Sequence, residues 1–197
     1  MCGIVGYIGA RRPVPILLEG LKRLEYRGYD SAGVATMNGS DSLFVCKRAG
    51  RVRELEHALP ELPPKANVGI AHTRWATHGP PSDNNSHPHL STDERIAVVH
   101  NGIIENHSTL RTMLIAEGVN FRSETDTEVV PHLIARFYEG DLQAAVKQAL
   151  GLIQGTYGLV AMCVDEPDRL VVARNGSPIV LGVGDNEMFV ASDAPAL

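Results

Sequence analysis

Apolar residues recur with two different spacings along this chain of 197 residues, and the two spacings predict alternating strands and helices. Helices are expected where apolar positions repeat every three or four residues, at 13–24, 52–59, 105–118, 125–137 and 142–153. Strands are expected where short apolar runs lie between turn residues, at 2–8, 34–37, 43–48, 68–72, 96–100, 157–164, 170–174, 179–182 and 188–191. Strands cluster early and late with helices between them, which predicts an α+β fold with largely antiparallel sheets.

Local signals support several of these boundaries. Pro13 suits the first turn of a helix, and Gly118 is a typical residue for ending one. Asn38-Gly39 lies between two apolar runs and predicts a hairpin turn. Residues 125–128 have the spacing of a capping box, so we expect a helix to open there. Residues 73–90 are rich in Gly and Pro and are expected to form a loop.

Composition narrows the class of protein. The 44% of hydrophobic residues allows one sizeable core, and we expect a single domain over residues 1–197. The net charge of −5 and the absence of a Lys/Arg-rich run argue against a nucleic-acid partner. No apolar run approaches the ~20 residues that a membrane span needs, and no signal peptide opens the chain. Three scattered cysteines fit a reducing environment, so we expect a cytoplasmic protein.

Cys2 directly follows Met1. If Met1 is removed, one residue carries both a thiol nucleophile and a free α-amino group. That amino group titrates near pH ~7.7–8.0, which suits a general base at cellular pH. The alternative is that Cys2 is a small buried residue at the start of a strand, and position alone favours this alternative.

The segment 72–79 concentrates polar chemistry in eight residues, among them the only Trp of the chain. Arg74 offers a planar fork that suits a carboxylate, and Thr77 and His78 could add donors beside it. The alternative is a polar strand end with Trp75 filling the core. The two interpretations are about even on the residues alone.

Two further sites have both a functional and a structural interpretation. Asn101-Gly102 could form an oxyanion hole from a side-chain and a backbone N–H, but Asn-Gly most often forms a turn. Asp126 could bind a substrate ammonium, or it could be an acid favoured by the helix dipole. The eight His lack the spacings of common metal sites, and no nucleotide-binding fingerprint occurs, so we expect no metal and no cofactor.

Taken together, the segments 2–6, 23–33, 72–79, 99–106 and 123–128 resemble the amino-terminal glutaminase domain of the glucosamine-6-phosphate synthase family. These are class II glutamine amidotransferases of the N-terminal-nucleophile hydrolase type. The resemblance runs from residue 2 to residue 197 and implies a four-layer α/β/β/α sandwich with two mostly antiparallel sheets. It also implies hydrolysis of L-glutamine to L-glutamate and ammonia without a cofactor.

The resemblance assigns the reacting groups and the substrate contacts. Cys2 would attack the glutamine amide while its α-amino group moves protons, and the side chain of Asn101 and the backbone N–H of Gly102 would stabilise the oxyanion. Arg74, with Thr77 and His78, would hold the α-carboxylate of glutamine. Asp126 and the Gly102 carbonyl would hold its α-ammonium.

The surroundings of the site follow from the same resemblance. Trp75 would lie where ammonia leaves, and Arg27 and Tyr29 would belong to a loop over the site. The full-length enzyme carries a sugar-phosphate isomerase domain, is expected to be a homodimer, and uses the ammonia to convert fructose 6-phosphate to glucosamine 6-phosphate. That isomerase part is absent from this sequence, and we expect the glutaminase domain to be truncated at its C-terminal end. A non-catalytic glutamine-binding module, or a different ammonia acceptor, are the alternatives.

Overall fold

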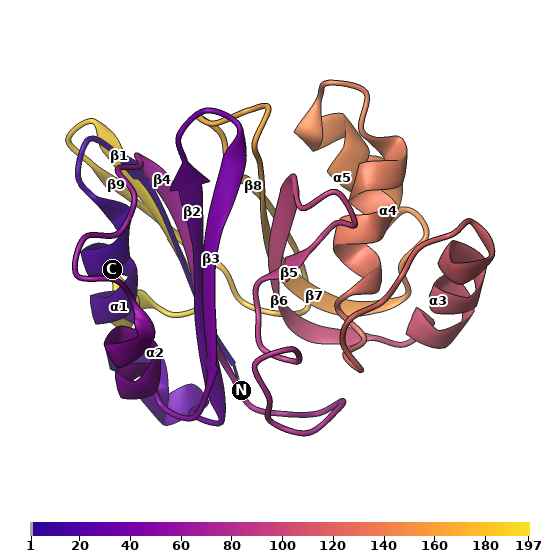
Figure 1. The fold of residues 1–197 in the computed structure, drawn as a ribbon, viewed down its shortest axis with the longest axis horizontal. Helices are drawn as coiled ribbons and strands as arrows, with labels where there is room; N and C mark the ends of the chain where they lie inside the picture. The colour runs from indigo at the N-terminus through magenta and orange to yellow at the C-terminus, as the bar shows by residue number, and fades with distance from the viewer. Residues whose placement is uncertain (1) are drawn as a thin grey trace.

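The computed structural model describes residues 2–197, and Met1, whose removal the proposed chemistry of Cys2 requires, lies outside the described residues. Two sheets stack face to face, and helices cover both outer faces (Figure 1). The six-stranded sheet has the order β3-β2-β4-β1-β10-β9, and the four-stranded sheet has the order β5-β6-β7-β8. Every pair of neighbouring strands is antiparallel. The predicted α+β class and the four-layer sandwich are confirmed.

The strands are β1 (Gly3–Gly9), β2 (Ser31–Asn38), β3 (Ser42–Ala49), β4 (Val68–Arg74), β5 (His89–Leu90), β6 (Ile96–Ile104), β7 (Gly155–Cys163), β8 (Val171–Asn175), β9 (Val180–Gly184) and β10 (Glu187–Ala191). The α-helices are α1 (Pro13–Leu24), α2 (Val52–Ala58), α3 (His107–Ala116), α4 (Val129–Phe137) and α5 (Leu142–Leu150). Two short 3-10 helices are η1 (Glu25–Arg27) and η2 (Ala194–Ala196).

Three apolar clusters hold the four layers together. One packs α1 and α2 on the six-stranded sheet, one packs α3, α4 and α5 on the four-stranded sheet, and the third lies between the sheets. β1 serves two of them, because alternate side chains of a strand point to opposite faces. Ile4 belongs to the inter-sheet cluster, whereas Val5 and Tyr7 face α1. Burial on both faces explains why β1 reads as an apolar run rather than as an alternating pattern.

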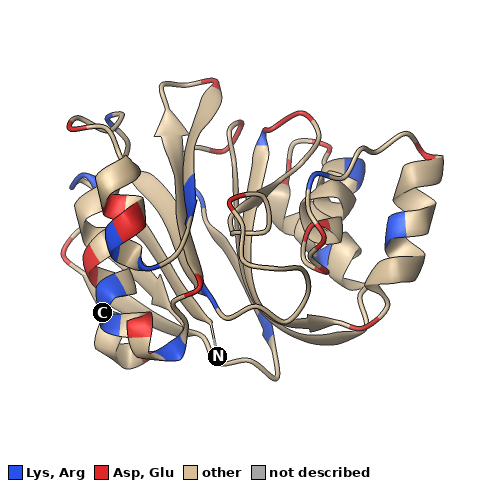
Figure 2. Ribbon diagram, turned by 60° about the horizontal axis from the view of Figure 1, so that its bottom comes forward, with Lys and Arg blue, Asp and Glu red and all other residues tan. Residues whose placement is uncertain are grey.

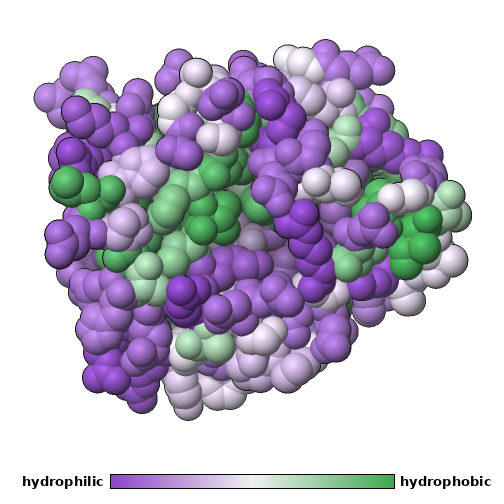
Figure 3. Space-filling view, viewed as in Figure 1, coloured by the Kyte–Doolittle hydropathy of each residue, from purple (hydrophilic) through white to green (hydrophobic). Residues whose placement is uncertain are grey.

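Figure 2 shows Lys and Arg interspersed with Asp and Glu along the ribbon. β3 is an edge strand and is largely half-buried. Its Leu43 and Val45 pack against the inter-sheet cluster, and Figure 3 shows apolar surface gathered over β2 and β3. Among residues 2–197, no helix has the length and hydropathy to cross a bilayer.

The strand predicted at 96–100 is longer, and the alternative of a turn at Asn101-Gly102 is wrong, because β6 continues through both residues to Ile104. Asn101 pairs with Gly158 and Gly102 pairs with Tyr157 of β7. Gly102 has φ +134°, and a Cβ there would lie 2.0 Å from the Thr156 carbonyl oxygen. Only glycine fits such a close approach of two strands, so this residue allows pairing to continue instead of ending it.

The helix expected to open at residue 125 begins later, at Val129. Thr125 does not cap it, since its Oγ1 lies 3.0 Å from Nε2 of His89. Glu128 reaches back further than a capping box would, and accepts hydrogen bonds from the backbone N–H groups of Arg122 and Ser123, both at 2.7 Å. The segment 123–128 is therefore a loop that the Glu128 carboxylate holds in place.

The predicted loop 73–90 is shorter at both ends. β4 runs on to Arg74, where it pairs with β2, and β5 pairs His89 and Leu90 with β6. The irregular segment is therefore 75–88. Arg74 consequently projects from the rigid end of a strand, which is a more exact position for a binding group than a loop.

Gly33 in β2 provides a test of how tightly segment 75–88 packs on the six-stranded sheet. A Cβ at Gly33 would lie 2.1 Å from the His87 carbonyl oxygen, so Gly33→Ala should displace that backbone. We expect a loss of about 1–3 kcal/mol in the free energy of unfolding, as for other overpacked sites, measured by urea denaturation. Gly182→Ala is the control, because its nearest neighbours lie 3.4 Å from the added Cβ. Equal stability of the two variants would contradict this packing.

Candidate active site

Cys2 directly precedes β1, and its thiol lies beside the end of β4. The backbone N–H of Trp75 donates to Cys2 Sγ at 3.2 Å, and Sγ lies 3.7 Å from the Trp75 carbonyl oxygen. Burial raises the pKa of the Cys2 thiol above its usual value, although the Trp75 N–H opposes this effect. The thiol therefore stays protonated near neutral pH and needs a base to become a nucleophile.

Asn101 comes to the same place from the other sheet. Its side-chain Nδ2 donates to the carbonyl oxygen of Cys2 at 2.9 Å, although 99 positions separate the two residues. Gly102 follows on β6 with its backbone in a conformation that leaves no room for a side chain. The structure thus brings the predicted nucleophile and the two predicted oxyanion donors together.

Arg74 is buried at the end of β4, with 4% of its surface exposed. Its guanidinium donates to the carbonyl of His78, to that of Gly79 at 3.2 Å and to that of Pro80 at 3.4 Å. Burial lowers the pKa of Arg74, and the charge of Asp30 is the largest opposing influence. The Arg74 guanidinium therefore holds the backbone of residues 78–80 in segment 75–88.

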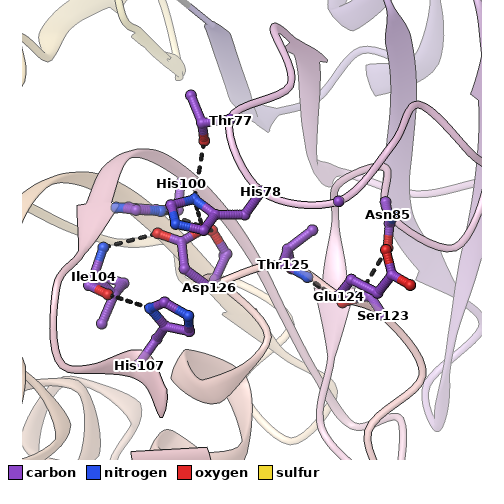
Figure 4. A network of polar contacts seen from close by, with 12 residues as sticks. Thr77, His78, Asn85, His100, Ile104, His107, Ser123, Glu124, Thr125 and Asp126 are labelled. Carbon is purple, nitrogen blue, oxygen red and sulfur yellow. Dashed lines mark hydrogen bonds and ion pairs between the residues drawn. The ribbon is translucent and has the colours of Figure 1, made fainter.

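Asp126 lies between His78 and Ile104 (Figure 4). Its Oδ2 accepts the backbone N–H of Ile104 at 2.8 Å, and its Oδ1 lies 3.9 Å from Nδ1 of His78. Thr77 Oγ1 lies 3.2 Å from the same His78 nitrogen. His107 donates from Nδ1 to the Ile104 carbonyl at 2.9 Å. The Asp126 carboxylate is thus fixed by the N–H of Ile104 and faces His78 in segment 75–88.

The aromatic residues lie at the surface beside the thiol. Trp75 is 51% exposed, so the alternative in which it fills the core is wrong. The Tyr29 ring packs edge-on against it, with ring centroids 5.7 Å apart. Arg27 lies in η1 rather than in an open loop, and its Nη1 pairs with Asp193 Oδ2 at 2.8 Å. Its expected place over the pocket stays a prediction.

The sequence model of the family described as "Glutamine amidotransferase domain" matches residues 72–197, which is more than half of the chain. The chain belongs to this family. The matched part includes the end of β4, Asn101-Gly102 on β6, and Asp126. Among residues 2–197, no group of three or more His, Cys, Asp or Glu is arranged to hold a metal ion.

Relatives of known name agree with this membership of the glutamine amidotransferase domain family. The chain is 57% identical over 197 residues to the glutamine–fructose-6-phosphate aminotransferase [isomerizing] of Symbiobacterium thermophilum. It is 59% identical over 199 residues to the protein of the same name from Idiomarina loihiensis. Both comparisons cover 100% of this chain and 32% of the relative, so the chain spans about a third of the length of these curated relatives.

Solved structures place the amidotransferase domain in the N-terminal-nucleophile hydrolase fold. The glutamine phosphoribosylpyrophosphate amidotransferase from B. subtilis, complexed with ADP and GMP, superimposes with a TM-score of 0.85 at 28% identity. That comparison covers 99% of this chain and 42% of the other. A glutamine aminotransferase class-II domain protein from Silicibacter pomeroyi, at 17% identity and a TM-score of 0.65 over 96% of this chain and 88% of the other, shares the fold.

Residues without a predicted role also shape the site of this amidotransferase domain. Asp30 accepts the backbone N–H of Ala76 through Oδ2 and the Ser31 hydroxyl at 3.1 Å through Oδ1. His72 lies fully buried in β4 and contacts Asn101. A polar residue inside an otherwise apolar strand signals such a role, because a buried polar group needs a partner.

Glu128 pins the loop that carries Asp126. Burial alone would raise the pKa of Glu128, but the His132 ring and the N–H groups of Arg122 and Ser123 outweigh it and hold the pKa at about 2. The Ser123 hydroxyl also donates to it at 2.5 Å. This carboxylate is therefore charged whenever the protein is folded at neutral pH.

Glu128→Gln should destabilise the domain at neutral pH and have less effect in acid. The pKa of Glu128 is depressed on folding, so its contribution is complete above about pH 4.5, the ordinary value, and is lost as the pH falls toward 2. We expect a loss of about 1.5–3 kcal/mol at pH 7, as for hydrogen bonds to a charged group, shrinking by pH 3. Chemical denaturation at both pH values measures it. Glu124→Gln, an exposed position on the same loop, is the control. A pH-independent effect would refute the charge assignment.

Proposed function

We propose that this domain hydrolyses the side-chain amide of L-glutamine to L-glutamate and ammonia, with Cys2 as the nucleophile. The observation that carries the proposal is the hydrogen bond of 2.9 Å from Asn101 Nδ2 to the Cys2 carbonyl. It sets an amide donor beside the thiol, where the negative charge of an acyl-transfer intermediate would develop. Family membership supports glutamine as the amide donor.

The chemistry begins with the α-amino group of Cys2, which is free once Met1 has been removed. It accepts the thiol proton, and Sγ attacks the amide carbon of glutamine to form a C–S bond. Asn101 Nδ2–H and Gly102 N–H stabilise the resulting oxyanion. The protonated amino group then gives its proton to the departing nitrogen, so that ammonia leaves and a thioester remains. Water hydrolyses the thioester to glutamate and regenerates the thiol.

Glutamine itself would be held by its two charged ends. Arg74, with Thr77 and His78, binds the α-carboxylate, since a guanidinium still has donors beyond those that face the loop carbonyls. Asp126 and the Gly102 carbonyl bind the α-ammonium. A cation and a separate anion in one site would select a zwitterionic amino acid over a simple amide.

The ammonia would serve a partner domain. The names of the relatives and the third of their length that this chain spans support a sugar-phosphate isomerase domain as that partner in a full-length, homodimeric cytoplasmic enzyme. There the ammonia would convert fructose 6-phosphate to glucosamine 6-phosphate. In this proposal residues 1–197 are the glutaminase domain, and the exposed Trp75 lies where ammonia leaves. Arg27 and Tyr29 belong to a loop over the site, with the Tyr29 ring packed against Trp75.

The state of the N-terminus decides between an enzyme and a non-catalytic glutamine-binding module. A chain with Cys2 at its start should release glutamate, whereas retention of Met1, or Cys2→Ala, should lower the rate by at least ~10³-fold, as losses of a nucleophile or its base do. Mass spectrometry of the N-terminus, alongside a glutaminase assay, makes this comparison. Equal rates for all three chains would end the assignment of Cys2.

Asn101 and Arg74 should affect different kinetic constants. Asn101→Ala should lower kcat by about 10²–10³-fold with little change in KM, because the oxyanion forms only during reaction. Arg74→Ala should chiefly raise KM for glutamine, by about 10–100-fold, because a charged hydrogen bond to the bound substrate is lost. Steady-state kinetics separate the two, with circular dichroism as the check on folding. Near-normal turnover of Asn101→Ala, or an unchanged KM for Arg74→Ala, would overturn the respective role.

A further inference from the structure

His72 is a fully buried imidazole in the middle layer of the sandwich, where β4 faces β6. Its Nε2 lies 3.0 Å from the carbonyl oxygen of His100 and 3.0 Å from Oδ1 of Asn101. A backbone carbonyl can only accept a hydrogen bond, so the ring proton of His72 must be on Nε2. The tautomer therefore follows from the position of the His100 carbonyl.

The same reasoning fixes the orientation of the Asn101 carboxamide. The atom that faces a protonated Nε2 must be an acceptor, so Oδ1 faces His72 and Nδ2 faces Cys2. The Cys2 carbonyl at 2.9 Å from Nδ2 is again an acceptor only. A flipped carboxamide would set NH₂ against Nε2–H and oxygen against oxygen. Two backbone carbonyls and one imidazole thus allow a single orientation.

We propose that His72 is the positioning residue of the oxyanion site: its neutral Nε2–H holds the Asn101 carboxamide so that Nδ2 is presented to the substrate bound at Cys2. This inference rests on the proposed function of Asn101. Without the imidazole, only the Cys2 carbonyl still keeps Nδ2 toward Cys2, so the donor for the oxyanion is in place for a smaller part of the time.

The surroundings keep the His72 ring neutral. Its Nδ1 is buried without a hydrogen-bond partner among residues 2–197, and the ring packs against that of His87 with centroids 4.1 Å apart. Burial lowers the pKa of His72 to about 3. The imidazole therefore neither gains nor loses a proton near neutral pH and acts on the reaction only through Asn101.

Kinetics of paired variants separate positioning from simple core packing. His72→Leu should lower kcat for glutamine hydrolysis by about 10–100-fold with KM changed less than about threefold, a part of the cost of losing one oxyanion donor. His72→Gln, whose amide N–H can reach the same acceptor, should recover most of that loss. Thr36→Val removes an equally buried polar group from the neighbouring strand β2 and should leave kcat within about twofold.

A double-mutant cycle tests the path of the effect. In the Asn101→Ala background, His72→Leu should change kcat less than about twofold, because its target is already gone. Multiplying effects of the two substitutions, or a folded His72→Leu chain with unaltered kcat, would overturn the proposal. Thermal unfolding of each variant shows whether it is folded.

The tautomer can be read without any variant or activity. In protein labelled with ¹⁵N-histidine, the chemical shifts of the two ring nitrogens distinguish Nε2–H from Nδ1–H. We expect neutral, Nε2-protonated His72 between pH 6 and about 8, a range well above its pKa. An Nδ1–H tautomer would sink the positioning role even if the domain is an active glutaminase. The Nε2–H tautomer in a domain without glutaminase activity would instead leave the geometry intact and refute the proposed function.

Discussion

Hydrogen bonds between the two sheets fix the part of the molecule where chemistry is proposed. Cys2 leads into β1 of the six-stranded sheet, whereas Asn101 belongs to β6 of the four-stranded sheet. The carboxamide of Asn101 reaches across to the Cys2 carbonyl, and His72 of β4 reaches in the other direction to the carbonyl of His100. Polar bonds inside an interface that is otherwise apolar are costly unless every partner is in place, so they define one register of the sheets.

Charged side chains also hold the backbone of the two irregular segments beside the site. Arg74 binds three successive carbonyls of segment 75–88, and Asp30 binds its N–H at Ala76. Glu128 does the same for the loop that carries Asp126. These irregular segments lack the ladder bonds of a sheet, and buried ionic groups replace those bonds. The walls of the site are therefore held in place by side-chain hydrogen bonds.

Periodicity along the chain was sufficient to predict the fold class and most elements, because both faces of the central strands β1, β2 and β4 and one face of each helix are buried. Periodicity failed where a polar side chain contacts a residue that is distant in the sequence. Thr125 has the spacing of a cap but contacts His89, and Asn101-Gly102 has the composition of a turn but continues a strand opposite Gly158. No local pattern contains those partners. Likewise Cys2, Arg74 and Asp126 could be named from residue chemistry and family resemblance, whereas His72 needed the neighbouring sheet to acquire a role.

The inter-sheet cluster has a consequence beyond stability. Residues such as Ile70 and Val99 fill the space between the layers and so set the separation of β4 and β6. The spacing between thiol and carboxamide is inherited from that separation, since each group is anchored to its own sheet. Apolar side chains that do not touch the substrate thus determine the distance between the Cys2 thiol and the Asn101 carboxamide. A core residue of another size would alter the alignment of the site as well as the packing. The volume of this core is therefore constrained both by stability and by the geometry of the site.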